Sequence, residues 1–392
     1  MVFVMTACAE NSSQSEKSQP AEQTTVQSTT MSAEEINDRK LDKFISDMTL
    51  EEKVGQMFFV RCPDEDAVQQ VSKYNIGGYI LFGRDFDGKT KDEVVDDIHS
   101  YQNEADIPLL IGVDEEGGTV VRVSSNPNLR ETPFLSPKDT YADGGWDAVK
   151  QDAEEKADLL LSLGINVNLA PVCDMTSDEY GFMYDRSFSS DVDMENRYVR
   201  TVVETSKSKK LGTVLKHFPG YGNNSDTHTG IAYDDRDYSE FENTDFKPFY
   251  QGIESGADCI LVSHNIVNCM DSEYPASLSQ KVHDILRNEF KFDGVIMTDD
   301  LIMDAITDFT GDEAAAVTAA KCGNDLLCCS SVDTQYPAVL EAVQNGEIPE
   351  TQVDASVKRI LKWKQNLGIF NIDTYQKKVK STEPTDTVGS EE

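Results

Sequence analysis

The densest group of chemically capable residues lies in the segment 216–230, KHFPGYGNNSDTHTG. An apolar run ends there at Lys216 and His217 and gives way to a loop rich in Gly, Pro and Asn. Asp226 and His228 stand two positions apart in that loop, a spacing that lets a carboxylate orient an imidazole and stabilise its charged form. A histidine with a pKa of ~6.5 can both give and take a proton near neutrality. The segment therefore predicts His228 as a proton carrier and Asp226 as its partner.

A second candidate group ends the run GVIMTDD (294–300). We expect Asp299 to point into the same cleft as a nucleophilic carboxylate. Asp300 follows directly with its side chain directed elsewhere, so we expect a helix cap or a salt-bridge partner there. A carboxylate and a proton donor around one cleft suit cleavage of a glycosidic bond through a covalent intermediate.

These groups must be positioned by the apolar runs that precede them. Near-continuous apolar runs are typical of strands that are buried on both faces. There are eight: MFFVRC (57–62), GGYILF (77–82), PLLIGVD (108–114), INVNLAPV (165–172), GTVLKHF (212–218), DCILVSH (258–264), GVIMTDD (294–300) and DLLCCS (325–330). Amphipathic helix patterns alternate with them, for example over 90–105, 148–164, 277–290 and 311–323. The pattern predicts an α/β fold with a single TIM-type (β/α)8 barrel, and an open doubly wound sheet is the alternative.

In such a barrel the active site is built from the carboxyl ends of the strands, where polar residues end several of these runs. Of the five histidines we expect three, His217, His228 and His264, at this mouth. His99 and His283 lie in predicted amphipathic helices, so we expect them at the surface or at a boundary. For any one charged group a structural ion pair is an alternative to catalysis, because such pairs perturb pKa values too.

Charge excludes some partners. The 392 residues include 71 acidic and 35 basic residues, a formal net charge of −36, which would repel nucleic acid and anionic membrane surfaces. We expect no nucleic-acid partner. Residues 9–35 are rich in Ser, Thr and Gln and predict a disordered tether, 36–372 the barrel domain, and 373–392 a polar tail.

The first eight residues, MVFVMTAC, resemble the end of a bacterial lipoprotein signal, which would place a lipid on Cys8. We therefore expect an exported protein, anchored to the outer face of the cell membrane only through that lipid. The other seven cysteines are unevenly spaced and lack zinc-type pairs, so we expect buried thiols and no metal. They are Cys62, Cys173, Cys259, Cys269, Cys322, Cys328 and Cys329.

Several segments together resemble glycoside hydrolase family 3, and in particular its bacterial β-N-acetylglucosaminidase branch. They are DEEGGTVVR (114–122), GINVNLAPVCD (164–174), DRSFSSD (185–191), KHFPGYGNNSDTHTG (216–230), ILVSH (260–264), GVIMTDDLIM (294–303) and AAKCGNDLL (319–327). The resemblance runs from about residue 40 to 370, and KHFPG with a downstream Asp-x-His is specific to that branch.

The resemblance implies that Asp299 is the nucleophile, His228 the acid/base and Asp226 its partner. It further implies that the sugar's hydroxyls and acetamido group are held by Asp114, Arg122, Arg186, Lys216 and His217. No cofactor and no metal are implied.

The chain departs from the pattern of the branch in the acid/base loop. Tyr221 stands where His is usual and Asn223 where Asp is usual, and the loop is one residue shorter before the Asp-x-His pair. Thr119 replaces a common Arg. These changes leave the reaction intact but put the preferred aglycone in doubt. Many relatives carry a second α/β domain, and we expect none here.

The sequence thus predicts a monomeric, retaining, exo-acting β-N-acetylhexosaminidase whose substrate is an amino-sugar oligosaccharide or glycoconjugate. The substrate could be a muropeptide, a chitin fragment or a host glycan. Alternatives are another family-3 specificity such as a β-glucosidase, a β-N-acetylglucosamine phosphorylase, a Schiff-base aldolase with Lys216 as nucleophile, or a catalytically silent sugar-binding lipoprotein.

Overall fold

The computed structural model describes residues 31–222, 230–310 and 312–377. The chain separates into two units, Met1–Arg39 and Lys40–Glu392, and the boundary falls within helix α1 (Ala33–Ser46). The predicted tether therefore ends earlier than expected, because residues 33–35 are already helical. A capping interaction accounts for this: Glu35 N–H donates to Ser32 Oγ (3.1 Å) and Ser32 N–H donates to the Glu35 carboxylate (2.7 Å).

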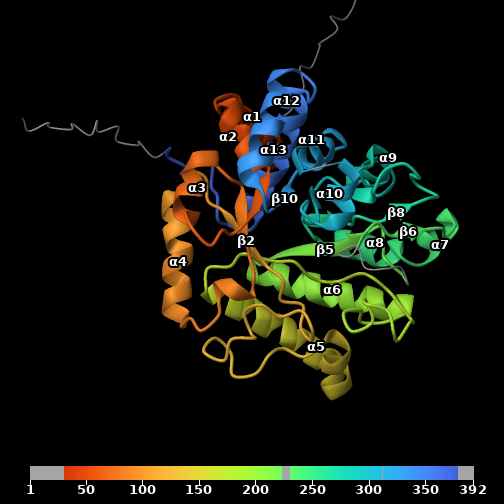
Figure 1. Cartoon of the computed structure of the whole chain (residues 1–392). Coiled ribbons are helices and arrows are strands. Elements are labelled where there is room, and N and C mark those ends of the chain that lie inside the picture. Colours follow the sequence, from red (N-terminus) through yellow and green to blue (C-terminus); the bar gives the residue numbers. More distant parts are fainter. Residues whose placement is uncertain (1–30, 223–229, 311, 378–392) are drawn as a thin grey trace, which may run out of the picture. The chain divides into compact units, whose positions relative to one another are not determined.

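The second unit contains one parallel eight-stranded sheet, which Figure 1 shows at its centre. The strands are β1 (Phe58–Arg61), β2 (Gly78–Leu81), β3 (Leu110–Val113), β4 (Val167–Asn168), β5 (Gly212–Phe218), β7 (Cys259–Val262), β9 (Val295–Thr298) and β10 (Leu327–Cys329). Their order is β10-β1-β2-β3-β4-β5-β7-β9, and a bridge between Met297 and Leu326 joins the two ends. All eight predicted strands are confirmed, and the sheet is the predicted (β/α)8 barrel. A separate pair, β6 (Tyr233–Asp234) and β8 (Ile266–Val267), follows strands β5 and β7.

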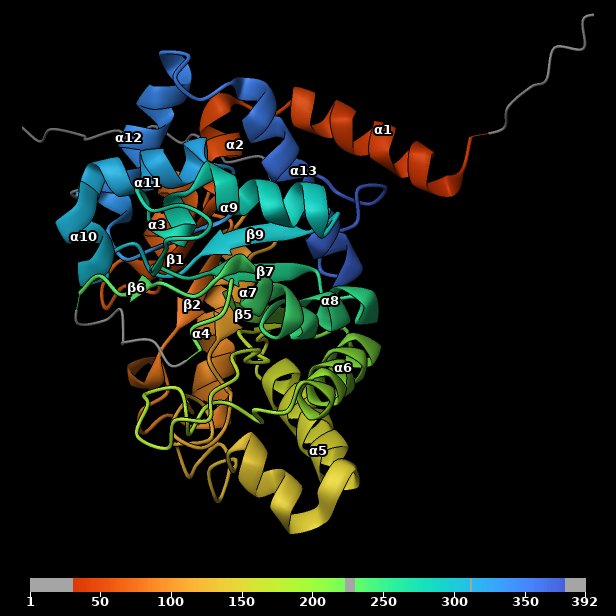
Figure 2. The same cartoon turned by 90° about the vertical axis from the view of Figure 1, so that its right-hand side faces the viewer.

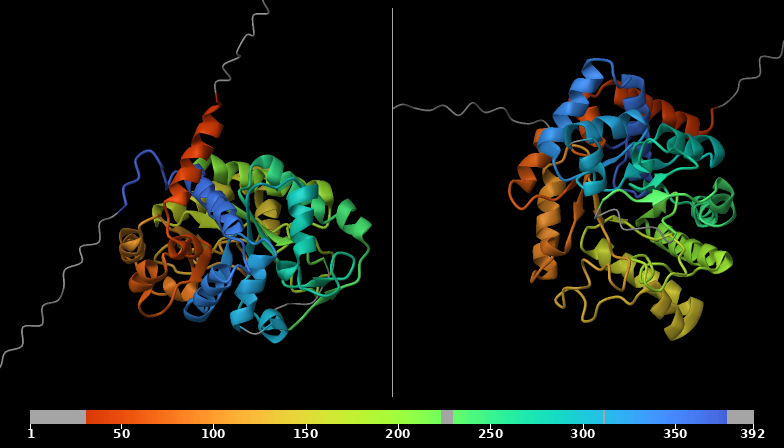
Figure 3. Two further views of the ribbon diagram at one scale, coloured as in Figure 1. Left: turned by 90° about the horizontal axis from the view of Figure 1, so that it is seen from above. Right: turned by 45° about the vertical axis from the view of Figure 1, so that its right-hand side comes forward.

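Helices lie outside the strands, as Figures 2 and 3 show. They are α2 (Leu50–Gln56), α3 (Ala67–Tyr74), α4 (Lys91–Glu104), α5 (Pro137–Ser162), α6 (Val192–Lys209), α7 (Tyr238–Asn243), α8 (Phe246–Ser255), α9 (Gln280–Asp284), α10 (Asp304–Thr310), α11 (Asp312–Lys321), α12 (Val332–Gln344) and α13 (Glu350–Asn366). Capping boxes begin α2 at Thr49 and α4 at Thr90. Helix α5 starts well before the predicted residue 148 and is broken at Gly144 and Gly145.

The segment 277–290 is not the single amphipathic helix that was expected. It consists of a 3-10 turn (Ala276–Leu278), the short helix α9 and a π-helical turn (Ile285–Glu289). The expectation that His283 lies at the surface is also wrong, since only 1% of it is exposed and its Nδ1 lies 2.7 Å from Ser279 O. His99 is exposed, as predicted.

The core is apolar on both faces of the strands, which is the reason for their continuous apolar sequences. Phe59, Ile80 and Leu110 belong to one buried cluster and Phe58, Tyr79 and Ile111 to another. Six of the seven cysteines among the described residues are buried, as expected, but Cys269 is exposed. Within the described ranges, no helix is both long and apolar enough to cross a membrane.

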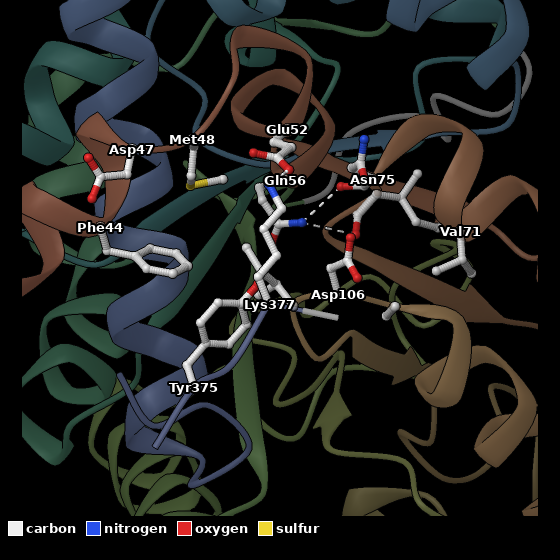
Figure 4. A pocket seen from close by; sticks show the side chains of 13 residues that line it. Phe44, Asp47, Met48, Glu52, Gln56, Val71, Asn75, Asp106, Tyr375 and Lys377 are labelled. Carbon is white, nitrogen blue, oxygen red and sulfur yellow. Dashed lines mark hydrogen bonds and ion pairs between the residues drawn. The ribbon is translucent and has the colours of Figure 1, made fainter. Parts of the chain in front are cut away.

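A pocket of about 250 Å³ lies beside the segments that lead into β1, β2 and β3, at the end of the barrel opposite the carboxyl ends of the strands (Figure 4). Tyr375 lines it and packs edge-on against Phe44, so the predicted tail begins with a docked stretch. Gln56 also lines it, donating from Nε2 to Asn75 O (2.8 Å), while its Oε1 accepts from Lys364 Nζ (2.8 Å).

Candidate active site

A cavity of about 320 Å³ opens at the carboxyl ends of the barrel strands. Six of the eight predicted site residues line it. Two of them directly follow strands β3 and β9, and two more lie near the end of β5. The six are Asp114, Arg122, Arg186, Lys216, His217 and Asp299. The other two, Asp226 and His228, lie outside the described residues. The structure therefore brings together, in one cavity, the nucleophile candidate and all of the predicted sugar-binding residues.

Four of the lining residues form a network that we call the anchoring cluster: Asp114, Glu116, Arg186 and Lys216. Lys216 Nζ lies 2.6 Å from Asp114 Oδ1 and 2.6 Å from Glu116 Oε1. Glu116 also accepts two hydrogen bonds from Arg186, from Nη2 at 2.8 Å and from Nε at 3.0 Å. Glu116 thus links both cations. The paired hydrogen bonds between the Arg186 guanidinium and the Glu116 carboxylate are strong and directional.

The electrostatics of the anchoring cluster keep Glu116 and Lys216 charged. Burial alone would raise the pKa of Glu116, but Lys216 and Arg186 outweigh it and hold that pKa well below the usual range. Burial alone would lower the pKa of Lys216, but the carboxylates of Asp114 and Glu116 outweigh it and raise that pKa. The cluster presents fixed charges that can hydrogen-bond sugar hydroxyls without reorganising.

His217 is held by a buried carboxylate that our sequence reasoning did not assign to the site, Asp174. Asp174 Oδ2 lies 2.7 Å from His217 Nδ1 and accepts from His217 N–H at 3.0 Å. Its other oxygen accepts from Tyr221 N–H at 2.7 Å. The opposite ring nitrogen, Nε2, lies 3.3 Å from Arg186 Nη2. Asp174 therefore orients His217 at the edge of the anchoring cluster.

Asp299 directly follows β9, and its Oδ1 accepts from the N–H of Asp300 at 2.8 Å. Asp300 also lines the cavity. It does not cap a helix, and among the described residues it forms no ion pair. Its Oδ2 accepts from Ser330 Oγ (2.6 Å) and its Oδ1 from Ile302 N–H (3.2 Å). Burial raises the pKa of Asp300, and the neighbouring charge of Asp299 adds to this effect.

Two arginines flank Phe82 on the β1 and β2 side of the cavity. The guanidinium carbon of Arg61 lies 4.4 Å from the Phe82 ring centroid and that of Arg122 lies 6.0 Å away. Both Nε atoms are buried without a hydrogen-bond partner among the described residues. The loop that carries Arg122 is ordered by Glu115, which accepts from Arg122 N–H (2.9 Å) and Val123 N–H (2.7 Å).

One predicted mouth residue is placed differently. His264 is fully buried and does not line the cavity, because it bonds to Ser277 and to the Asp300 backbone below the mouth. Three further residues of the site, Glu116, Asp174 and Arg61, were assigned no role from the sequence. Each stands at or just after an apolar run, so its position at the end of a predicted strand could have indicated that it belongs to the site. No group of three or more His, Cys, Asp and Glu side chains that could hold a metal ion occurs in the part of the chain that the structure describes.

The comparisons with known proteins identify the family of the chain. Residues 49–363 match the family described as "Glycosyl hydrolase family 3 N terminal domain". The chain is 32% identical over 273 residues to a β-hexosaminidase of Nitrosomonas eutropha, covering 68% of this chain and 77% of that protein. It is 31% identical over 327 residues to a β-hexosaminidase of Mycobacterium tuberculosis, covering 79% and 81%.

A solved structure gives the same result for the fold. A family 3 β-N-acetylglucosaminidase from a Paenibacillus species matches with a TM-score of 0.77 and 29% identity, over 88% of this chain and 66% of that one. The barrel, the contents of its mouth and the match over most of the chain lead to one conclusion. The chain belongs to glycosyl hydrolase family 3 and is a glycoside hydrolase.

Proposed function

We propose that the protein is a retaining, exo-acting β-N-acetylhexosaminidase that removes terminal β-linked N-acetylglucosamine. The observation that carries this proposal is one cavity in which Asp299 shares the mouth with the anchoring cluster and His217. Its volume of about 320 Å³ is at the small end of the ~300–1,000 Å³ of ligand pockets, which suits a single terminal sugar. The names of the relatives, β-hexosaminidase and β-N-acetylglucosaminidase, support an N-acetylated hexose as that sugar.

In the proposed reaction the anchoring cluster and His217 bind the hydroxyls and the acetamido group of the sugar. Asp299 attacks the anomeric carbon while His228, oriented by Asp226, protonates the departing oxygen, and a glycosyl ester forms. Water activated by His228 then hydrolyses the ester with retention of configuration.

The geometry argues against the aldolase alternative. A Schiff-base lysine must be neutral to attack a carbonyl, and burial can provide this by lowering its pKa. Lys216 instead contacts two carboxylates that raise its pKa, so it stays an ammonium group. Lys216 is therefore assigned to binding.

The test is Asp299→Ala with 4-nitrophenyl β-N-acetylglucosaminide as substrate. We expect the release of 4-nitrophenol to fall by about 10³-fold or more, as for the loss of other catalytic nucleophiles. Asp284→Ala, at an exposed aspartate of α9, is the matched control and should retain the parental rate. An unchanged rate in Asp299→Ala would contradict the assignment. Rates on the β-N-acetylgalactosaminide and the β-glucoside, each with and without phosphate, then distinguish the other specificities and phosphorolysis.

We also propose that the protein is exported and anchored by lipid on Cys8, where it would act on peptidoglycan fragments or environmental amino sugars. The support is the sequence MVFVMTAC followed by a polar segment. In cells fed a clickable fatty acid, the parent should become labelled and Cys8→Ser should not. Equal labelling of both proteins would contradict the lipid site.

A further inference from the structure

A fully buried histidine bonds to the residue that follows the proposed nucleophile. His264 follows strand β7, and its Nδ1 lies 2.7 Å from Ser277 Oγ. Its Nε2 lies 3.0 Å from the carbonyl oxygen of Asp300. Because a carbonyl oxygen can only accept, Nε2 carries a proton and donates it to Asp300. Nδ1 of a neutral ring is then an acceptor for the hydroxyl of Ser277, which is itself fully buried.

The residue that accepts from His264 also contacts the nucleophile. The backbone N–H of Asp300 donates to Asp299 Oδ1 at 2.8 Å, and the backbone N–H of Asp299 donates to Val262 O at 3.2 Å. The Asp300 backbone is thus held at its carbonyl by His264 and holds the Asp299 carboxylate through its amide.

The other side of this turn is fixed by strand β10 and the residues that follow it. Ser330 Oγ donates to Asp300 Oδ2 at 2.6 Å, and Leu301 N–H donates to Cys328 O at 3.1 Å. From the β7 side, the side chain of His264 binds the backbone of the turn at the Asp300 carbonyl. A fully buried imidazole is costly unless both nitrogens are bonded, and here both are.

We propose that His264 is a positioning residue for the glycosidase reaction: by bonding the Asp300 carbonyl it fixes the orientation of the Asp299 carboxylate toward the anomeric carbon. The inference rests on the proposed function, in which Asp299 is the nucleophile. It assigns to His264 no proton transfer and no contact with substrate. Its effect therefore falls on the rate of nucleophilic attack and not on sugar binding.

The experiment compares His264→Leu, His264→Gln and His264→Asn with the parent. Two readouts are used: kcat and KM for 4-nitrophenyl β-N-acetylglucosaminide, and the rate of covalent labelling by the 5-fluoro glycosyl fluoride of N-acetylglucosamine, followed by intact-protein mass. A displacement of ~1 Å at a reacting group can cost about 100-fold, so His264→Leu should lower kcat and the labelling rate by about that factor. KM should change little. His264→Gln should recover most of the loss, because its amide nitrogen can donate where Nε2 does.

His283→Leu is the matched control, since His283 is an equally buried histidine that bonds to a backbone carbonyl away from the cavity. It should keep the parental kcat and labelling rate even if it lowers the melting temperature. Where His264→Leu does not fold, the Gln and Asn variants decide: Gln reaches the Asp300 carbonyl and should be active, whereas the shorter Asn should be slow.

Parental labelling in His264→Leu, equal rates in Gln and Asn, or an equal loss in His283→Leu would overturn the inference. A parent enzyme that cleaves no β-N-acetylhexosaminide would instead refute the proposed function, so the two failures are distinguishable.

Discussion

Lys364 offers a sharp test of the energetics of this barrel. It lies in α13 with no exposed surface, and among the described residues the only hydrogen bond or ion pair of its side-chain amine is to Gln56 Oε1 at 2.8 Å. Burial lowers the pKa of Lys364 from 10.5 to about 7. A neutral amide oxygen cannot offset the loss of water around an ammonium group, so the charged form is disfavoured in the folded state.

The sign of the effect follows from proton binding. Between pH 7 and 10.5 the unfolded chain holds the Lys364 proton and the folded chain releases it, so stability rises with pH in this window. At ~1.4 kcal/mol per pKa unit, the lowered pKa costs about 4 kcal/mol at pH 7 and about 1 kcal/mol at pH 9.5.

The perturbation is Lys364→Met, which removes this cost but leaves Gln56 Oε1 unpaired, a loss of ~1–3 kcal/mol at either pH. We therefore expect the variant to be about 2 kcal/mol more stable than the parent at pH 7 and about 1 kcal/mol less stable at pH 9.5. Urea unfolding of both proteins at both pH values measures the difference. Lys362→Met, in the same helix but partly exposed, controls for methionine in α13. A stability difference between variant and parent that does not change with pH would refute the reasoning.

Two further predictions concern the active site. Glu116→Gln should destabilise the fold by about 3 kcal/mol at pH 7, because Arg186 loses its buried counter-charge and Lys216 loses one of its two. Since the pKa of Glu116 is depressed in the folded state, its contribution is present above ~pH 4.3 and is lost as the pH falls below that. Urea midpoints of parent and variant should therefore converge on acidification, and a constant gap would count against the pairing. Asp174→Asn should raise KM about tenfold with a smaller change in kcat, because it weakens the hydrogen bond that orients His217. Steady-state kinetics measure both constants, and an unchanged KM would contradict this prediction.

The fold could be predicted from the sequence because each strand is buried on both faces and is therefore continuously apolar. PLLIGVD gives β3 directly, and its end supplies Asp114 to the mouth. The same reasoning placed Lys216 and Asp299 correctly, since both end such runs.

Side-chain direction beyond a strand end could not be predicted. Glu115 and Glu116 are adjacent and chemically identical, yet Glu115 turns toward backbone N–H groups of a neighbouring loop while Glu116 faces the mouth. Which one faces inward depends on the loop that returns at residues 122–124, which no local pattern encodes. His283 was misplaced for a related reason: its short helix is buried through contacts with a distant segment at Cys322.

The internal pairing of the anchoring cluster has a consequence for the conditions under which the protein can work. Dissolved ions screen exposed charges over a Debye length of ~8–10 Å at 0.10–0.15 M salt, but they act much less on buried pairs. Lys216 and Glu116 have 3% and 2% of their side chains exposed, and a neutral sugar gains nothing from long-range attraction. Sugar capture should therefore be insensitive to salinity, although the chain as a whole carries a net charge of −36.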